Sequence, residues 1–134
     1  MRFYLLKQRL SDKRNWSLPG GKLERGETIN EGIIREMKKE TGLDVEIECL
    51  LYLCDVFTSG NSLLHITFLL KQVGGTLKLP TNEHDENPIK DVQFIPVTDL
   101  EAYGFSNKFV TLIKNNFPNR GNYVGDKTNI GLGI

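Results

Sequence analysis

The stretch Gly21–Leu43, GKLERGETINEGIIREMKKETGL, decides the fold because it combines a glycine turn, a capped helix and regularly spaced charges. Thr28 and Glu31 have the spacing of a capping box, in which each side chain satisfies a backbone N–H group at the helix start. Gly42 follows where a left-handed residue commonly ends a helix. The sequence therefore predicts a helix over residues 29–41. Its apolar residues predict a buried stripe at helical spacing, which consists of Ile29, Ile33, Ile34 and Met37.

Two carboxylates of this helix have the spacing that a metal site requires. Glu36 and Glu40 are four residues apart, so they project from one helix face. Mg²⁺ binds a few carboxylates together with water and phosphate oxygens. The turn at Gly20 and Gly21 lets backbone approach this face without an intervening side chain. A lone pair of this kind is usually a solvated helix face, but the fixed glycine, glutamate and arginine positions around it favour a Mg²⁺ site.

Eight positions of this stretch resemble the Nudix box of the Nudix (MutT-like) hydrolases. They are Gly21, Glu27, Arg35, Glu36, Met37, Glu40, Gly42 and Leu43. The ninth position of the box, normally a glutamate, is Lys39 in this sequence. The preceding residues Trp16–Gly21 also resemble the lead-in to the family motif. The resemblance is therefore specific over residues 16–43, and beyond residue 43 it consists only of a similar order of strands and helices.

The resemblance implies a role for each matched charged residue. Glu36 and Glu40 would bind Mg²⁺, or Mn²⁺ in its place, together with the backbone carbonyl of Gly20. Arg35 would orient the loop and the catalytic carboxylates, and Glu27 would tie the loop to the helix. The implied fold is an α/β/α sandwich with a mixed β-sheet, formed by residues 1–134 as a single Nudix domain.

The general base is left open between Glu36 and an acidic loop further along the chain. Glu83, Asp85 and Glu86 stand in that loop beside His84, roughly where Nudix proteins often supply an extra carboxylate. We include Glu86 among the candidate catalytic residues, although a solvated loop is an equal interpretation. His65 could act as a base, but its place in an apolar strand favours a strand residue. Trp16 could stack on a nucleobase, but a packing or loop-anchoring role is favoured.

The other expected elements come from apolar patterning and turn residues. Strands are predicted over residues 3–9, 45–57, 62–73, 76–79 and 92–97, a helical turn over 99–103, a helix over 107–116 and a possible extended tail over 118–134. Nudix domains usually have one more strand before the first of these. Either the sheet lacks that strand or another element covers the exposed edge. An open edge invites pairing with a second chain, so a homodimer is one expected state.

Composition excludes several classes of partner. Seventeen basic and seventeen acidic residues cancel, so no general attraction to nucleic acid or to an anionic membrane is expected. No apolar run approaches the ~20 residues of a membrane span, and the first residues lack the pattern of a secretion signal. Cys49 and Cys54 are the two cysteines and are interpreted as reduced thiols. The expected location is cytoplasmic.

Together these features predict a Mg²⁺-dependent hydrolase of phosphoanhydride bonds. Its substrate would be a nucleoside diphosphate linked to another group, with a nucleoside triphosphate slightly ahead of a nucleotide sugar. Members that cleave ADP-ribose tend to have a proline in the region where this sequence has Ser59. The sequence therefore does not point to ADP-ribose as the substrate. The alternative is a catalytically weak Nudix-like module that binds a nucleotide, which Lys39 favours.

Overall fold

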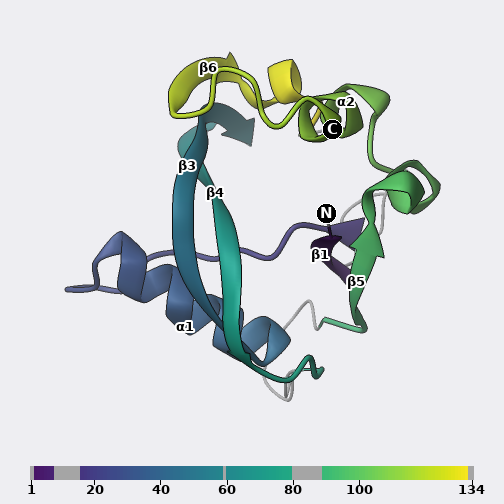
Figure 1. Cartoon of the computed structure of the whole chain (residues 1–134). Coiled ribbons are helices and arrows are strands. Elements are labelled where there is room, and N and C mark those ends of the chain that lie inside the picture. Colours follow the sequence, from purple (N-terminus) through teal and green to yellow (C-terminus); the bar gives the residue numbers. More distant parts are fainter. Residues whose placement is uncertain (1, 8–15, 59, 80–88, 133–134) are drawn as a thin grey trace. The chain divides into compact units, whose positions relative to one another are not determined.

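The computed structural model describes residues 2–58, except 8–15, together with residues 60–79 and 89–132. The chain forms two compact units. The first contains residues 1–46 and 71–96, and the second contains residues 47–70 and 97–134. Two long strands, β3 (Leu43–Thr58) and β4 (Asn61–Gly75), run through both units (Figure 1). Among the described residues, no helix has the length and apolar character needed to cross a membrane.

The first unit contains a small antiparallel sheet centred on β1 (Arg2–Lys7). Its two neighbours are β2 (Trp16–Ser17) and β5 (Val92–Pro96). The predicted strand over residues 3–9 thus begins one residue earlier, and its last positions lie outside the described residues. The strand predicted over 92–97 ends one residue earlier, at Pro96, whose missing N–H group suits a strand end.

The helix α1 (Ile29–Thr41) has the predicted bounds, because its capping residues form the predicted contacts. The Glu31 N–H donates to Thr28 Oγ1 at 3.1 Å, and the Thr28 N–H donates to Glu31 Oε1 at 3.2 Å. Gly42 has a φ of 80° and its N–H donates to the Lys38 carbonyl. The local signals of the sequence therefore determine both ends of this helix.

The buried stripe predicted for α1 is wrong at two positions. Ile29 and Ile34 are 40% and 38% exposed, whereas Met37 is buried. The buried positions of the helix are Gly32, Met37, Glu40 and Thr41. Because the buried face includes the carboxylate of Glu40, the spacing of apolar residues alone does not locate this face correctly.

The C-terminal end of α1 is closed by a second glycine far along the chain. Gly75 has a φ of 78°, and a Cβ atom there would lie 2.4 Å from the Gly42 carbonyl oxygen. The Lys78 N–H donates to the Thr41 carbonyl at 2.9 Å, which satisfies a carbonyl at the helix end. Residues 76–79 form no strand, so that prediction is wrong, because this segment bonds to the helix end.

The second unit contains most of a mixed sheet in which β3 lies between β4 and β6 (Asn122–Asp126). β6 pairs with β3 in parallel, with Asn122 opposite Tyr52. β3 and β4 are both longer than the strands predicted over 45–57 and 62–73. Among the described strands, β6 occupies one edge of β3, and β1 has neighbours on both sides.

The possible extended tail over residues 118–134 is corrected by the structure. This segment contains β6 and a short 3₁₀ helix, η2 (Lys127–Ile130). Ile130 and Leu132 are 2% and 4% exposed, so the segment contributes to the core. The pairing of β6 joins positions about seventy residues apart, which no local pattern reveals.

The remaining helices of the second unit agree with their predictions apart from their bounds. The turn predicted over 99–103 is the 3₁₀ helix η1 (Val97–Tyr103), and the helix predicted over 107–116 is α2 (Asn107–Lys114). Ser106 caps α2 by accepting the Phe109 N–H at 3.2 Å. Phe109 and Ile113 of α2 are buried.

Candidate active site

Arg35 of α1 binds the loop that precedes the helix. Its Nε donates to Glu27 Oε2 at 2.6 Å and its Nη2 donates to Glu27 Oε1 at 3.0 Å. Such a two-pronged pair is stronger and more directional than a contact with one atom. Nη2 also donates to the Lys22 carbonyl at 3.0 Å, and Glu24 lies 3.5 Å from Nη1. The loop is therefore held to the helix by one guanidinium group.

The same guanidinium fixes one of the two carboxylates of the helix. Arg35 Nη1 donates to Glu36 Oε1 at 2.5 Å. Glu36 also lies against the glycine turn, since a Cβ atom on Gly21 would be 2.3 Å from Glu36 Cδ and 2.6 Å from Oε2. Any side chain at position 21 would thus displace Glu36, which explains the glycine there. We call Arg35 with Glu24, Glu27 and Glu36 the Arg35 cluster.

Glu27 is held in its ionised form by the cluster. The Arg35 bonds, followed by the Glu24 N–H bond at 2.9 Å, lower the pKa of Glu27 to about 2. The same contacts raise the pKa of Arg35 above its ordinary value, with the bond to Glu27 contributing most. Both groups are therefore charged at neutral pH, and the loop keeps this geometry over a wide pH range.

Glu40, on α1, has a raised pKa, in contrast to the lowered pKa of Glu27. Glu40 as a residue is only 8% exposed, and its Oε2 accepts the Gly20 N–H at 3.0 Å. Burial, followed by the negative charge of Glu36, raises the pKa of Glu40 to about 7. The Gly20 bond and the charge of Lys39 act in the other direction. Glu40 is thus a buried carboxylate whose negative charge is incompletely compensated.

The residues fit a Mg²⁺ ion bound mainly by carboxylates, water and substrate. Within the described ranges, no group of three or more His, Cys, Asp or Glu side chains is placed to hold a metal ion. The available donors are Glu36 and Glu40, whose mutual repulsion a cation would relieve. Mg²⁺ commonly takes one or two protein carboxylates and completes its shell with water and phosphate oxygens.

Gly20 meets Glu40 through its N–H group. The predicted role of the Gly20 carbonyl as a metal ligand stays a prediction.

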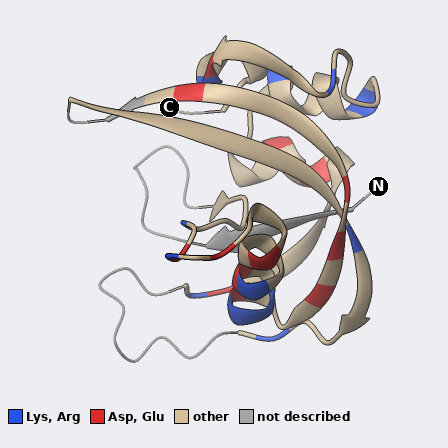
Figure 2. Ribbon diagram, turned by 90° about the vertical axis from the view of Figure 1, so that its left-hand side faces the viewer, with Lys and Arg blue, Asp and Glu red and all other residues tan. Residues whose placement is uncertain are grey.

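Lys39, the departure from the box, is exposed beside this site. Its charge lowers the pKa of Glu40, so the two side chains interact electrostatically. The neighbouring Lys38 instead pairs with Asp44 at 3.2 Å. Figure 2 shows that both acidic and basic residues lie along α1 and the loop before it.

The acidic loop with Glu83, His84, Asp85 and Glu86 lies outside the described residues. The assignment of Glu86 as a catalytic residue therefore stays a prediction.

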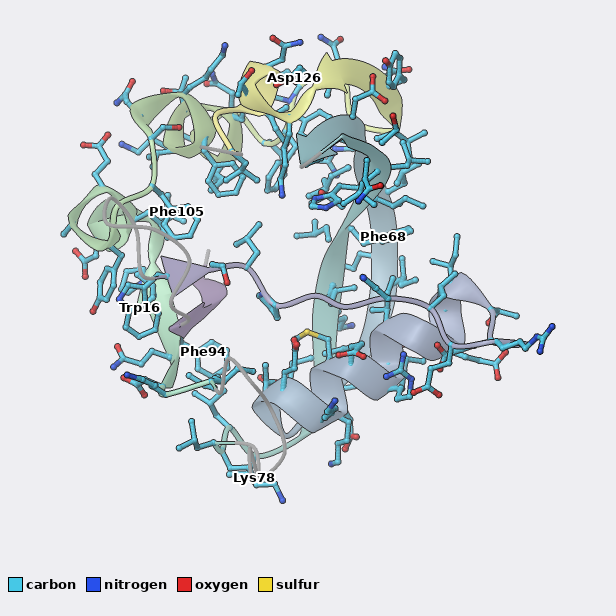
Figure 3. All side chains as sticks on the ribbon, turned by 180° about the vertical axis from the view of Figure 1, so that it is seen from behind. Trp16, Phe68, Lys78, Phe94, Phe105 and Asp126 are labelled. Carbon is cyan, nitrogen blue, oxygen red and sulfur yellow. The ribbon has the colours of Figure 1, made fainter. Side chains whose placement is uncertain are left out.

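His65 occupies a strand, as its structural interpretation predicted, whereas the packing or loop-anchoring role of Trp16 stays a prediction. His65 is half-buried on β4, and its Nδ1 lies 2.8 Å from Lys127 Nζ. Burial, followed by the charge of Lys127, lowers the pKa of His65. Trp16 is half-buried on β2, and Phe94 is on β5, the other strand that flanks β1 (Figure 3).

Both cysteines are free thiols, with Cys54 buried and Cys49 half-buried.

Several contacts at the site and at the end of its helix do not follow from the sequence pattern. The Lys22 carbonyl and the Glu24 carboxylate both contact Arg35, yet each stands in a charged loop without regular spacing. The close approach of Gly75 to Gly42 at the end of the helix was also not predicted, because these glycines lie 33 positions apart. The only feature of the sequence that could have indicated this approach is the glycine at the end of β4.

Comparison with known proteins identifies the family. The NUDIX domain model matches residues 1–113. The chain belongs to the Nudix family. An ADP-ribose pyrophosphatase of Methanocaldococcus jannaschii is 32% identical over 98 residues, which are 69% of this chain and 53% of that protein. The human 8-oxo-dGDP phosphatase NUDT18 is 45% identical over 64 residues, which are 48% of this chain and 19% of that protein. This Nudix chain thus spans about half the length of the first relative and a fifth of the second.

Solved structures of Nudix proteins share the fold. A UDP-X diphosphatase superposes with a TM-score of 0.65 and 21% identity, over 92% of this chain and 61% of that one. A NUDIX hydrolase from Nitrosomonas europaea gives a TM-score of 0.64 and 20% identity, over 93% of this chain and 72% of that one. The prediction of a Nudix-type α/β fold with a mixed sheet is therefore confirmed.

Proposed function

We propose that this Nudix chain hydrolyses a phosphoanhydride bond in a nucleoside diphosphate linked to another group, in a reaction that depends on Mg²⁺ or Mn²⁺. One observation carries the proposal. Glu40 is buried, and burial, followed by the negative charge of Glu36, raises its pKa to about 7; a bound divalent cation would compensate this negative charge. We also propose that residues 1–134 act as a single Nudix domain.

In this mechanism Glu36 and Glu40 would hold the cation. When bound, Mg²⁺ supplies charge neutralisation at the pyrophosphate and lowers the pKa of an attacking water. Arg35 orients Glu36 through their bond at 2.5 Å. Glu27 in turn fixes Arg35, so these two residues act by positioning. The residue that takes the proton from water is Glu36 or one of the acidic-loop residues, among which we propose Glu86.

The names of relatives support the substrate class. Those proteins are named for ADP-ribose, for 8-oxo-dGDP and for UDP linked to an unspecified group. All three are nucleoside diphosphates or their derivatives, so we place this class ahead of the nucleoside triphosphate that the sequence slightly favoured. Since the chain covers only part of these relatives, the choice among them requires an assay.

A second candidate function is supported by Lys39. Its ammonium group lies close enough to influence Glu40, at the position where the family box has a glutamate. A cation there could replace part of the metal charge and favour nucleotide binding over turnover. This candidate is a nucleotide-binding module with weak or no catalysis.

A panel of nucleotides separates the two candidates. Release of phosphate, pyrophosphate or nucleoside monophosphate is measured for ADP-ribose, UDP-sugars, nucleoside diphosphates and nucleoside triphosphates, with Mg²⁺ and with a chelator. The hydrolase proposal expects metal-dependent turnover of at least one diphosphate derivative. Nucleotide binding detected by calorimetry without turnover of any compound would replace it with the binding module.

Location and assembly complete the proposal. Two free thiols suit a reducing compartment, so we propose the cytoplasm. We also propose a homodimer of this chain.

A further inference from the structure

A histidine and a lysine of the second unit are in direct contact, outside the Arg35 cluster. His65 on β4 and Lys127, the first residue of η2, are both half-buried. The Nδ1 atom of His65 lies 2.8 Å from the Nζ atom of Lys127. A lysine ammonium group only donates hydrogen bonds, so Nδ1 accepts this bond and the imidazole carries its proton on Nε2. The bond therefore requires a neutral His65.

Lys127 lies where the last described segment of the chain turns back onto the second unit. Its carbonyl accepts the Leu132 N–H at 3.3 Å, and Ile130 and Leu132 are buried. The Gly131 carbonyl accepts a bond from the Ser106 hydroxyl, at the start of α2, at 2.8 Å. A change at Lys127 thus acts on a short helix whose far end belongs to the core.

Other titratable groups lie on the elements that surround this pair. They are Cys54 and Asp55 on β3, Tyr123 and Asp126 on β6, and Lys108 on α2. The charges of Lys127, Asp55 and Asp126 all act on the buried Cys54 thiol. Burial raises the pKa of Cys54, and the bonds from Thr128 lower the pKa of Asp126. These two groups therefore keep their charge states between about pH 5 and 7, where a histidine normally titrates.

We propose that His65 and Lys127 form a pH-sensitive latch, which fastens η2 to β4 at neutral pH and opens when His65 is protonated. Protonation converts Nδ1 from an acceptor to a donor, so the bond to Nζ is lost. It also places two positive charges against each other, and at half-buried positions solvent screens their repulsion incompletely. A single proton thus replaces an attraction between η2 and β4 with a repulsion.

The pH range of the latch follows from the environment of His65. Burial, followed by the charge of Lys127, lowers the pKa of His65 from its ordinary value of 6.5. The unfolded chain therefore takes up this proton at a higher pH than the folded protein does. The contribution of the latch is complete above pH 6.5 and is lost as pH falls through the lowered pKa. Neither residue belongs to the Arg35 cluster, so the latch does not rest on the proposed hydrolase activity.

The first test is a titration of the histidine rings of the full chain by NMR. Lys127→Met keeps the length of the side chain but removes its charge, so the pKa of His65 should rise by roughly half a unit. Lys108→Met is the matched control, since Lys108 is an exposed lysine on α2, and it should leave this pKa unchanged. His65→Gln identifies the ring signal, because His84 is the other histidine of the chain.

The second test is hydrogen exchange, expressed as protection factors so that the intrinsic pH dependence of exchange cancels. Protection of the Gly131 and Leu132 amides, which bond within η2, should fall at least about threefold from pH 7.5 to 5. The Val110 amide, which donates to the Ser106 carbonyl in α2, is the reference for the rest of the unit. In His65→Gln the selective fall at Gly131 and Leu132 should disappear.

Three results would overturn the latch. One is a His65 pKa that Lys127→Met leaves unchanged. Another is protection at Gly131 and Leu132 that stays constant while His65 titrates, or that falls only in parallel with Val110. The third is a selective fall that persists in His65→Gln. None of these readouts requires turnover, so an inactive protein with a working latch would contradict only the proposed hydrolase function.

Discussion

Arg35 in the first unit and Arg120 in the second each bind a neighbouring loop, but the partners of Arg35 are negatively charged and those of Arg120 are neutral. Arg35 binds the carboxylates of Glu27 and Glu36 at 2.6 Å and 2.5 Å. Arg120 instead donates to the Asn116 carbonyl at 2.6 Å, lies 3.4 Å from Cys49 Sγ and stands 5.9 Å from the centre of the Phe117 ring. Arg35 therefore binds carboxylates, whereas Arg120 binds uncharged groups.

The difference separates a site from a structural anchor. Around Arg35 the acidic groups outnumber the one guanidinium, and Glu40 lies close by with a raised pKa. A divalent cation would stabilise that arrangement. Around Arg120, Asn116 and Phe117 have positive φ values of 58° and 53°, which are costly for residues other than glycine. Arg120 there holds a strained turn that leads into β6.

The largest expected effect comes from removing charge at the proposed metal site. Glu40→Gln keeps the size of the side chain and should lower turnover at least ~100-fold, roughly 2.7 kcal/mol of barrier. Glu46→Gln is the matched control, since Glu46 is an exposed glutamate just after the helix. Steady-state kinetics at saturating Mg²⁺ measure both. Near-full activity of a folded Glu40→Gln protein would remove this site from the mechanism.

Exchanging the two arginines for alanine tests the comparison directly. Arg35→Ala releases Glu27 and Glu36, so turnover should fall roughly 10- to 100-fold, one to two factors of 1.4 kcal/mol. Arg120→Ala should lower the free energy of unfolding by about 1 kcal/mol, through lost hydrogen bonds, and leave turnover near wild type. Kinetics and urea denaturation are measured on both variants. If Arg120→Ala also loses most of its turnover, the two arginines do not differ as proposed.

The sequence predicts the region around Arg35 far better than the region around Arg120. Thr28, Glu31 and Gly42 determine the helix through contacts within a few residues, so its bounds could be predicted. Arg120 acts on Cys49, 71 positions away, and the parallel pairing of β6 is similarly remote. The Gly- and Asn-rich composition of residues 118–134 indicated a tail, because composition does not report long-range pairing.

Within the site, the motif predicts which residues meet but not how they are solvated. Glu27, Arg35 and Glu36 are joined as the resemblance implied. The burial of Glu40 was not predicted, since a glutamate is normally placed on the exposed face of a helix. The approach of Gly20 backbone to this face was predicted, but the donation of its N–H group to Glu40 was not. Burial depends on packing against distant segments, and spacing along one helix does not contain that information.

The two perturbed glutamates predict opposite slopes of stability with pH for the metal-free protein. Glu40 has its pKa raised from 4.5 to about 7, so the folded protein retains a proton that the unfolded chain has lost. The free energy of unfolding should therefore fall as pH rises from 4.5 to about 7. For Glu27 the pKa is lowered to about 2, so its contribution is present above 4.5 and is lost as pH falls toward 2.

Chemical denaturation in a chelator, from acid to neutral pH, measures both slopes. Glu40→Gln should remove the fall between 4.5 and about 7, and Glu27→Gln should remove the loss below 4.5. Added Mg²⁺ should offset the fall at neutral pH, because it binds the ionised carboxylate. The assignment to Glu40 fails if the Gln variant shows the same slope as wild type.

The smallest expected effect is on Mg²⁺ dependence and comes from Lys39, whose charge acts on Glu40 although Lys39 is not part of the Arg35 cluster. Lys39→Glu changes the local charge by two units beside Glu40, and Lys39→Gln changes it by one. In the solvated setting of an exposed side chain, each unit should shift the Mg²⁺ half-saturation only about two- to threefold toward lower concentration. The Gln variant should therefore fall between wild type and the Glu variant. Lys38→Gln is the control, since Lys38 pairs with Asp44. Identical Mg²⁺ titrations for wild type and both Lys39 variants would mean that Lys39 points into solvent, and that the departure from the family box leaves metal binding unchanged.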